Sequence, residues 1–92
     1  VIEGNSATFG HNDGFNVTGS GHTLTENKSV SNFGDGFDVD GNNITLTGNK
    51  SVNNIGEGFD ISAGAVTTSV VENGASGNRV DFCDEGTGTV LT

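Results

Sequence analysis

The sequence predicts an all-β fold, a parallel solenoid of about four coils with three short strands in each coil. Two observations predict this class. The chain of 92 residues repeats itself with a period of 22, because NKSV at 27–30 returns at 49–52 and GDGFDV at 34–39 returns as GEGFDI at 56–61. In short runs apolar residues alternate with polar ones, which is the period of a strand, and no stretch shows helical spacing. A fixed period of this length is typical of stacked repeats.

The first predicted strand of each repeat contains a Gly-Phe pair and the apolar residue two positions later. These runs cover residues 14–17, 36–39 and 58–61. Side chains two positions apart on a strand lie on the same face. We therefore expect Phe15, Phe37 and Phe59 to stack inside the solenoid, one in each coil.

A second strand is predicted from the x-T-L-T runs at 22–25 and 44–47, and a third, weaker one from the Ser-Val pairs at 29–30 and 51–52. Glycine, asparagine and aspartate fill the gaps, and these residues tolerate turn conformations. Parallel strands of successive coils lie about 4.8 Å apart, so each column of the repeat becomes a ladder in space. The apolar column of the second strand reads Ile2, Leu24, Leu46, Val70 and Leu91.

Asparagine recurs at a fixed place before the third strand. Its side chain both donates and accepts hydrogen bonds, which suits a buried corner where successive coils meet. We expect this column to form a ladder through the interior, and a second asparagine column follows at residues 32, 54 and 78. The first column reads Asn5, Asn27, Asn49 and Asn73.

The repeats divide the chain at 5–26, 27–48, 49–72 and 73–92, within a single domain covering 1–92. The third repeat is two residues longer, near 62–68, and the last one lacks the Gly-Phe pair. We place Val80 and Phe82 where Phe59 and Ile61 lie in the preceding coil. The orientation of Cys83 stays open, and a single cysteine excludes an internal disulfide.

The pattern N-x-[AS]-x-x-x-N-x-x-x-GF-[DN]-[VI], with an x-T-L-T strand between coils, resembles the right-handed parallel β-helix repeat. That family includes pectate-lyase-like enzymes, polysaccharide epimerases, phage tailspikes and secreted surface proteins. The resemblance covers essentially the whole chain and implies a right-handed coil and an extracellular or cell-surface location. It is specific for fold rather than function, because one fold hosts many functions.

The net charge of −9 excludes nucleic acid as a partner, because no basic patch is available to displace counterions from phosphates. No apolar run approaches the roughly 20 residues of a membrane span, so we expect no membrane insertion. Enzymes of the resembled family use arginine or lysine bases, Ca²⁺-binding acids or paired carboxylates. This chain has only three cations, and we expect no catalytic residues. The alternative is a fragment of a secreted polysaccharide lyase or epimerase, and a polysaccharide partner stays open in either case.

Two adjacent columns of the repeat are acidic, and they are the candidate cation site. Carboxylates about 4.8 Å apart repel one another, and Ca²⁺ with its preference for oxygen ligands would relieve that repulsion. The alternative is a solvated acidic face that maintains solubility. The candidate Ca²⁺ ligands are Asp35, Asp38, Asp40, Glu57 and Asp60.

The sequence also contains glycosylation sequons, of which we expect those of Asn16 and Asn43 to be accessible.

Neither end of the predicted solenoid shows a capping helix, a proline or a block of charge. Open strand edges template further pairing, and terminal repeats normally need a cap. We therefore expect a non-catalytic structural module of a fibre, sheath or adhesin. Its partner would be either a second copy stacked head to tail or the flanking coils of a longer chain.

Overall fold

The computed structural model describes residues 1–92, which form three parallel sheets and no helix. The first sheet contains β1 (Ile2–Glu3), β4 (Thr23–Thr25), β7 (Thr45–Thr47), β10 (Ser69–Val71) and β13 (Val90–Leu91). The second contains β2 (Ser6–Thr8), β5 (Lys28–Val30), β8 (Lys50–Val52) and β11 (Gly74–Ser76). The third contains β3 (Phe15–Val17), β6 (Phe37–Val39), β9 (Glu57–Ile61) and β12 (Val80–Asp84). No helix in the chain could span a membrane.

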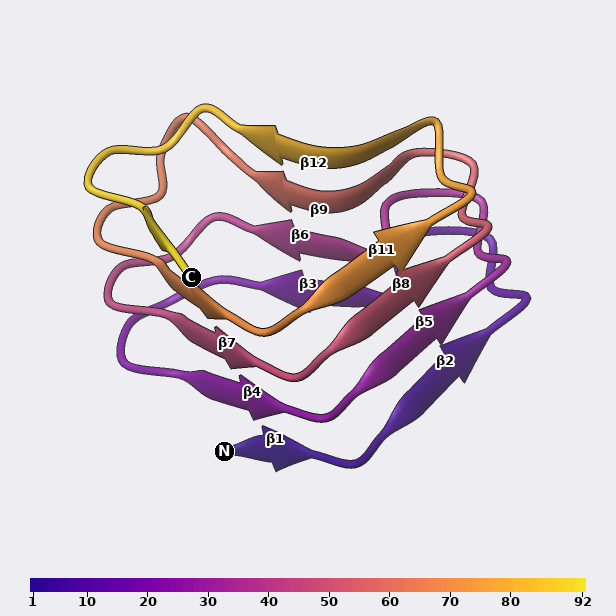
Figure 1. Cartoon of the computed structure of the whole chain (residues 1–92), viewed down its shortest axis with the longest axis horizontal. Helices are drawn as coiled ribbons and strands as arrows, with labels where there is room; N and C mark the ends of the chain where they lie inside the picture. The colour runs from indigo at the N-terminus through magenta and orange to yellow at the C-terminus, as the bar shows by residue number, and fades with distance from the viewer.

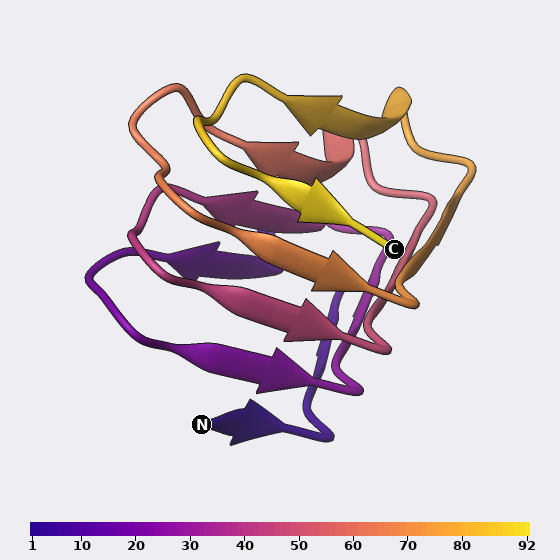
Figure 2. The ribbon, with the colours of Figure 1, turned by 60° about the vertical axis from the view of Figure 1, so that its left-hand side comes forward.

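The chain climbs as a right-handed coil, and each turn adds one strand to each sheet (Figures 1 and 2). The solenoid of about four coils is thus confirmed, and so is the third strand of each coil, for which the sequence pattern was weaker. Strand pairing follows the repeat, since Leu24 pairs with Leu46 and Phe15 with Phe37. Each column of the sequence is therefore a physical column of side chains that runs along the axis.

The inward columns form a narrow apolar core. The rings of Phe15 and Phe37 stack with their centroids 4.7 Å apart, and those of Phe37 and Phe59 are 4.8 Å apart. These separations equal the strand spacing, so each ring covers the one below it. The fully buried core residues are Val17, Leu24, Phe37, Val39, Ile44, Leu46, Phe59, Ile61, Ala65 and Val70.

Both asparagine columns form ladders of hydrogen bonds between coils. The main-chain N–H of Asn27 donates to Oδ1 of Asn49 over 2.8 Å, and its Nδ2 donates to the same oxygen over 3.1 Å. In the second column, the N–H of Asn32 donates to Oδ1 of Asn54 over 3.0 Å. These corners are buried, so the side-chain amides satisfy main-chain groups that water cannot reach.

Glycine at position 36 is required by a close approach between two walls of the solenoid. A Cβ there would overlap Oγ of Ser51 and lie 2.5 Å from the carbonyl oxygen of Gly58. Ser29 and Ser51 are completely buried at this corner. In the Gly-Phe pair, the glycine lies where no side chain fits, and the phenylalanine fills the core.

The predicted register of the last coil was wrong. Phe82 pairs with Phe59, and Val80 pairs with Glu57. The turn before β12 is one residue shorter than in the coil below, which moves the aromatic side chain onto the phenylalanine stack. Its ring lies 6.4 Å from that of Phe59, and Val80 is left 42% exposed. The larger ring buries more apolar surface than valine, so it takes the inward position.

The two extra residues of the third repeat lie in the turn between β9 and β10. The N–H of Ala65 donates to the carbonyl of Ser62 over 3.0 Å, and Ala65 is buried. Above this turn the asparagine ladder is undisturbed, since Asn49 N–H donates to Oδ1 of Asn73 over 2.8 Å. The insertion therefore changes the turn and not the ladders.

Candidate functional site

Acidic side chains gather on the outer side of the sheet formed by β3, β6, β9 and β12. They belong to two columns: a turn column, at the end of the turn that leads into each strand and including the first residue of β9, and a strand column within the strands. The first column reads Asp13, Asp35 and Glu57, and the second reads Asn16, Asp38, Asp60 and Cys83.

The turn column has a structural role that the sequence analysis missed. The N–H of Asp35 donates to Oδ1 of Asp13 over 2.8 Å, and the N–H of Glu57 donates to Oδ1 of Asp35 over 2.7 Å. A Cβ at Gly34 or Gly56 would overlap the carboxylate of the coil below. The glycine before each acid makes room for a third ladder, built from carboxylates. The recurrence of Gly-Asp and Gly-Glu was the signal for it.

The strand column faces outward, because the residues on either side of it in β6 and β9 point into the core. Oγ of Ser62 donates to Oδ1 of Asp38 over 2.9 Å, and the amide of Asn16 donates to Oδ2 of Asp38 over 3.4 Å. Asp60 lies between Asp38 and Cys83 in the register of the sheet. Cys83, whose orientation the sequence left open, therefore continues the acidic column into the last coil.

Carboxyl groups of the two columns come together in two overlapping sets. Within each set, one ligand atom from each residue lies within 4.8 Å of the others. Asp40 was predicted to join these ligands, and the structure places it outside both sets, exposed, after the end of β6. The sets are Asp13, Asp35 and Asp38, and Asp35, Glu57 and Asp60.

Burial and neighbouring carboxylates raise the pKa of several of these acids. Burial, with a further contribution from Glu57, raises the pKa of Asp35 from 3.8 to about 7. Burial also raises the pKa values of Asp38 and Asp60, with the carboxylates around them adding to the effect. A hydrogen bond from Asp35 lowers the pKa of Glu57, which also pairs with Arg79. Of the two, Asp35 therefore binds a proton more readily than Glu57.

Of the two predicted sequon asparagines, Asn16 lies on this face, whereas Asn43 lies in the turn before β7. Asn27 and Asn49 are buried, whereas the sequon asparagines Asn16 and Asn43 are exposed. The ring of His11 meets that of Phe33 edge-on at 5.7 Å, in an exposed turn.

The structure defines the chain as a parallel β-solenoid, with an acidic face on one of its three sheets. No family model, curated protein or solved structure matches it, so its class rests on the fold itself.

Proposed function

We propose that this chain is a non-catalytic structural module of an extracellular or cell-surface assembly, a fibre, sheath or adhesin, extended by stacking coil upon coil. The observation that carries the proposal is the complementarity of its two end faces. At the upper end the main-chain N–H of Asn73 has no acceptor, and at the lower end Oδ1 of Asn5 has no donor. A coil equivalent to the first, placed on the last, would supply the missing acceptor.

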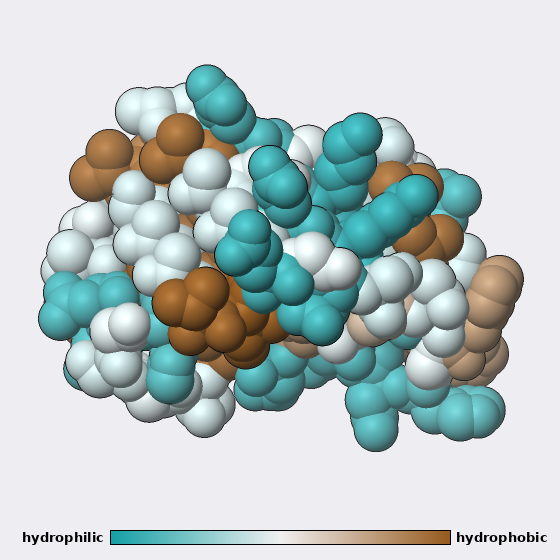
Figure 3. All heavy atoms as spheres, turned by 90° about the horizontal axis from the view of Figure 1, so that it is seen from below, coloured by the Kyte–Doolittle hydropathy of each residue, from teal (hydrophilic) through white to brown (hydrophobic).

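Apolar surface supports the same conclusion. The upper end has a hollow of about 400 Å³, lined mainly by the side chains of Phe59, Val70, Ala75, Phe82 and Leu91. Brown apolar atoms are visible in the middle of the lower face (Figure 3). Ile2, on the first strand β1, is 38% exposed. A further coil at either end would cover this surface and pair the free strand edges. A second copy or the flanking coils of a longer chain could provide that coil.

The second asparagine ladder, unlike the first, has no unsatisfied main-chain N–H at its upper end. The N–H of Asn78 donates to Oδ1 of Asp81 over 3.3 Å in its own coil, and the first coil has Gly10 at the corresponding position. The first coil of a stacked copy would bring no asparagine side chain to this corner. The last coil needs none, because the N–H of Asn78 already has an acceptor. The two end faces therefore match at both corners.

The arrangement of cations supports a non-catalytic role. Arg79 pairs with Glu57, while Lys28 and Lys50 lie on β5 and β8, in a different sheet from the acidic face. No arginine or lysine on the acidic face is thus free to act as a base.

Sedimentation velocity of the 92-residue chain over a range of concentrations tests the stacking. We expect association that grows with concentration, and its loss in Leu91→Lys, where a charge enters the end face. Val66→Lys is the matched control, because Val66 is 44% exposed against 55% for Leu91 but lies on a turn at the side. A parent chain that stays monomeric throughout would refute self-stacking. Formation of unsaturated products from acidic polysaccharides would instead favour the lyase alternative.

A further inference from the structure

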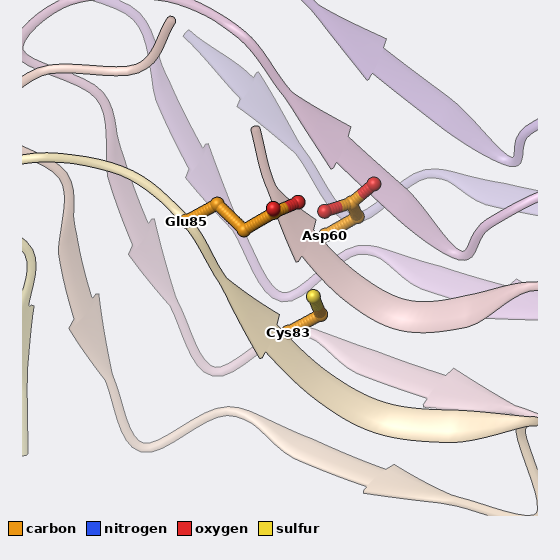
Figure 4. Close-up of side chains that lie close together, drawn as sticks. All are labelled: Asp60, Cys83 and Glu85. Atoms are coloured by element: carbon orange, nitrogen blue, oxygen red, sulfur yellow. The ribbon is translucent and has the colours of Figure 1, made fainter. Parts of the chain in front are cut away.

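A third group of ligand atoms lies at the upper edge of the acidic face. It consists of the carboxylates of Asp60 and Glu85 and the thiol of Cys83, with one ligand atom from each within 4.8 Å of the others. Asp60 and Cys83 are register partners on β9 and β12, and Glu85 follows β12 immediately. Figure 4 shows the three side chains extending toward a common space from two adjacent coils.

An unsatisfied oxygen in this group points to a ligand. Oδ1 of Asp60 is buried from solvent and accepts no hydrogen bond. Elsewhere on the face, Oδ1 of Asp13 and Oδ1 of Asp35 each accept a main-chain N–H, and Oδ1 of Asp38 accepts the hydroxyl of Ser62. A buried carboxylate oxygen without a donor is costly, and a bound cation would remove that cost.

No cation of the chain fills this position. The only ion pair is that of Arg79 with Glu57, and the two lysines lie on another sheet. The positive charge that would compensate Asp60 and Glu85 therefore has to come from outside the chain.

We propose that Asp60, Cys83 and Glu85 form a binding site for a zinc-like divalent metal ion. A thiolate together with two carboxylates suits a borderline ion such as Zn²⁺, whereas the sets made only of carboxylates suit a hard ion such as Ca²⁺. Donor atoms around a tetrahedral zinc ion lie about 3.5 Å from one another, so small side-chain rotations from the present arrangement would complete the site. Water fills the fourth position, and the thiol proton leaves to solvent on binding.

Titration with Co²⁺ as a spectroscopic probe for Zn²⁺ tests the proposal. We expect a thiolate-to-cobalt absorption band with visible bands of a tetrahedral ion, and we expect Zn²⁺ to abolish both by displacement. Cys83→Ser should remove the thiolate band, and Glu85→Gln, which alters a residue outside the strands, should weaken binding at least tenfold. Glu26→Gln is the matched control, because it removes one exposed carboxylate far along the sequence from the site and should change nothing.

Alkylation of Cys83 in the same samples gives a second measurement that does not depend on an absorption spectrum. Zn²⁺ should slow the reaction of the thiol with iodoacetamide, and an equal concentration of Ca²⁺ should not. Circular dichroism of each variant establishes that the solenoid is intact. Equal alkylation rates with and without Zn²⁺, or equal protection by Ca²⁺, would overturn the proposal.

Discussion

Asn49 joins three coils through one side chain. Its Oδ1 accepts two hydrogen bonds from Asn27 in the coil below, while its Nδ2 donates to Leu24 O and to Oδ1 of Asn73. The residue is completely buried, so none of these groups has water as a substitute partner. Asparagine recurs at this column because a residue with only a donor or only an acceptor would leave part of the corner unsatisfied.

Replacing Asn49 with alanine should destabilise the protein severely. The change leaves the main-chain N–H of Asn27 and the carbonyl oxygen of Leu24 without their side-chain partner, at about 1–3 kcal/mol for each unsatisfied group. We expect a loss of at least about 3 kcal/mol in the free energy of unfolding, measured by chemical denaturation. Asn12→Ala is the matched control, since Asn12 is exposed and its side chain makes no hydrogen bond. Similar losses for the two variants would contradict the ladder's importance.

Asp35 gives the stability an unusual dependence on pH. Its pKa is about 7 in the folded protein and 3.8 ordinarily, so the folded state binds this proton more tightly than the unfolded chain does. The resulting stabilisation is fully present below pH 3.8 and is lost as the pH rises through about 7. In buffer with a chelator, we expect the melting temperature to fall between pH 5 and pH 8.

Asp35→Asn isolates this contribution. The amide oxygen can still accept the main-chain N–H of Glu57, but the side chain no longer titrates. The melting temperature of this variant should depend less steeply on pH than that of the parent. Parallel pH profiles for the two proteins would show that Asp35 is not the titrating group.

At the scale of the strands, the corner between the second and third sheets tolerates no added atom. Gly36→Ala places a methyl group against Oγ of Ser51 and the main chain of Gly58. Overpacking of this kind costs typically about 1–3 kcal/mol, and here main chain as well as side chain has to move. Thermal unfolding should show a marked loss for Gly36→Ala and almost none for Gly74→Ala, where an added Cβ meets nothing within 4 Å. Equal stability of the two variants would argue against a rigid corner.

The strands also show where sequence reasoning succeeds and where it fails. The columns of Phe15 and Asn27 could be predicted because a fixed period converts spacing directly into register. Val80 was misplaced because alternation alone does not distinguish two apolar residues two apart when the turn before them changes length. The carboxylate ladder of Asp13 and Asp35 was hidden for another reason. Its acids look like a solvated surface until the main-chain donors of the next coil are in place.

For the whole molecule, five of the twelve acidic residues come together in the two carboxylate sets on one face. The two carboxylate sets lack a basic residue of their own except Arg79, which pairs with Glu57. Their repulsion accumulates along the axis, because the first three coils place their acids one above another. The predicted relief is Ca²⁺, which accepts several carboxylate oxygens at once.

Millimolar Ca²⁺ should therefore raise the melting temperature relative to chelator. Mg²⁺, which dehydrates reluctantly, should do so less. Asp38→Asn removes one charge from the first set and should reduce the calcium effect, while Glu72→Gln, an exposed position outside both sets, should leave it unchanged. Coincident melting curves in Ca²⁺ and chelator would leave the acidic face as a solubilising surface only.

The longer turn between β9 and β10 has a consequence for engineering the protein. Two extra residues enter there while the strands on either side keep their partners and Asn49 keeps its bonds to Asn73. The chain thus already contains one natural length variant, and it identifies the turn at which foreign sequence can be grafted. A peptide inserted there, and at the equivalent turn of each coil, would be displayed along one edge as a row of copies spaced by the strand separation, about 4.8 Å. The solenoid could thus present chosen peptides at a fixed and regular spacing.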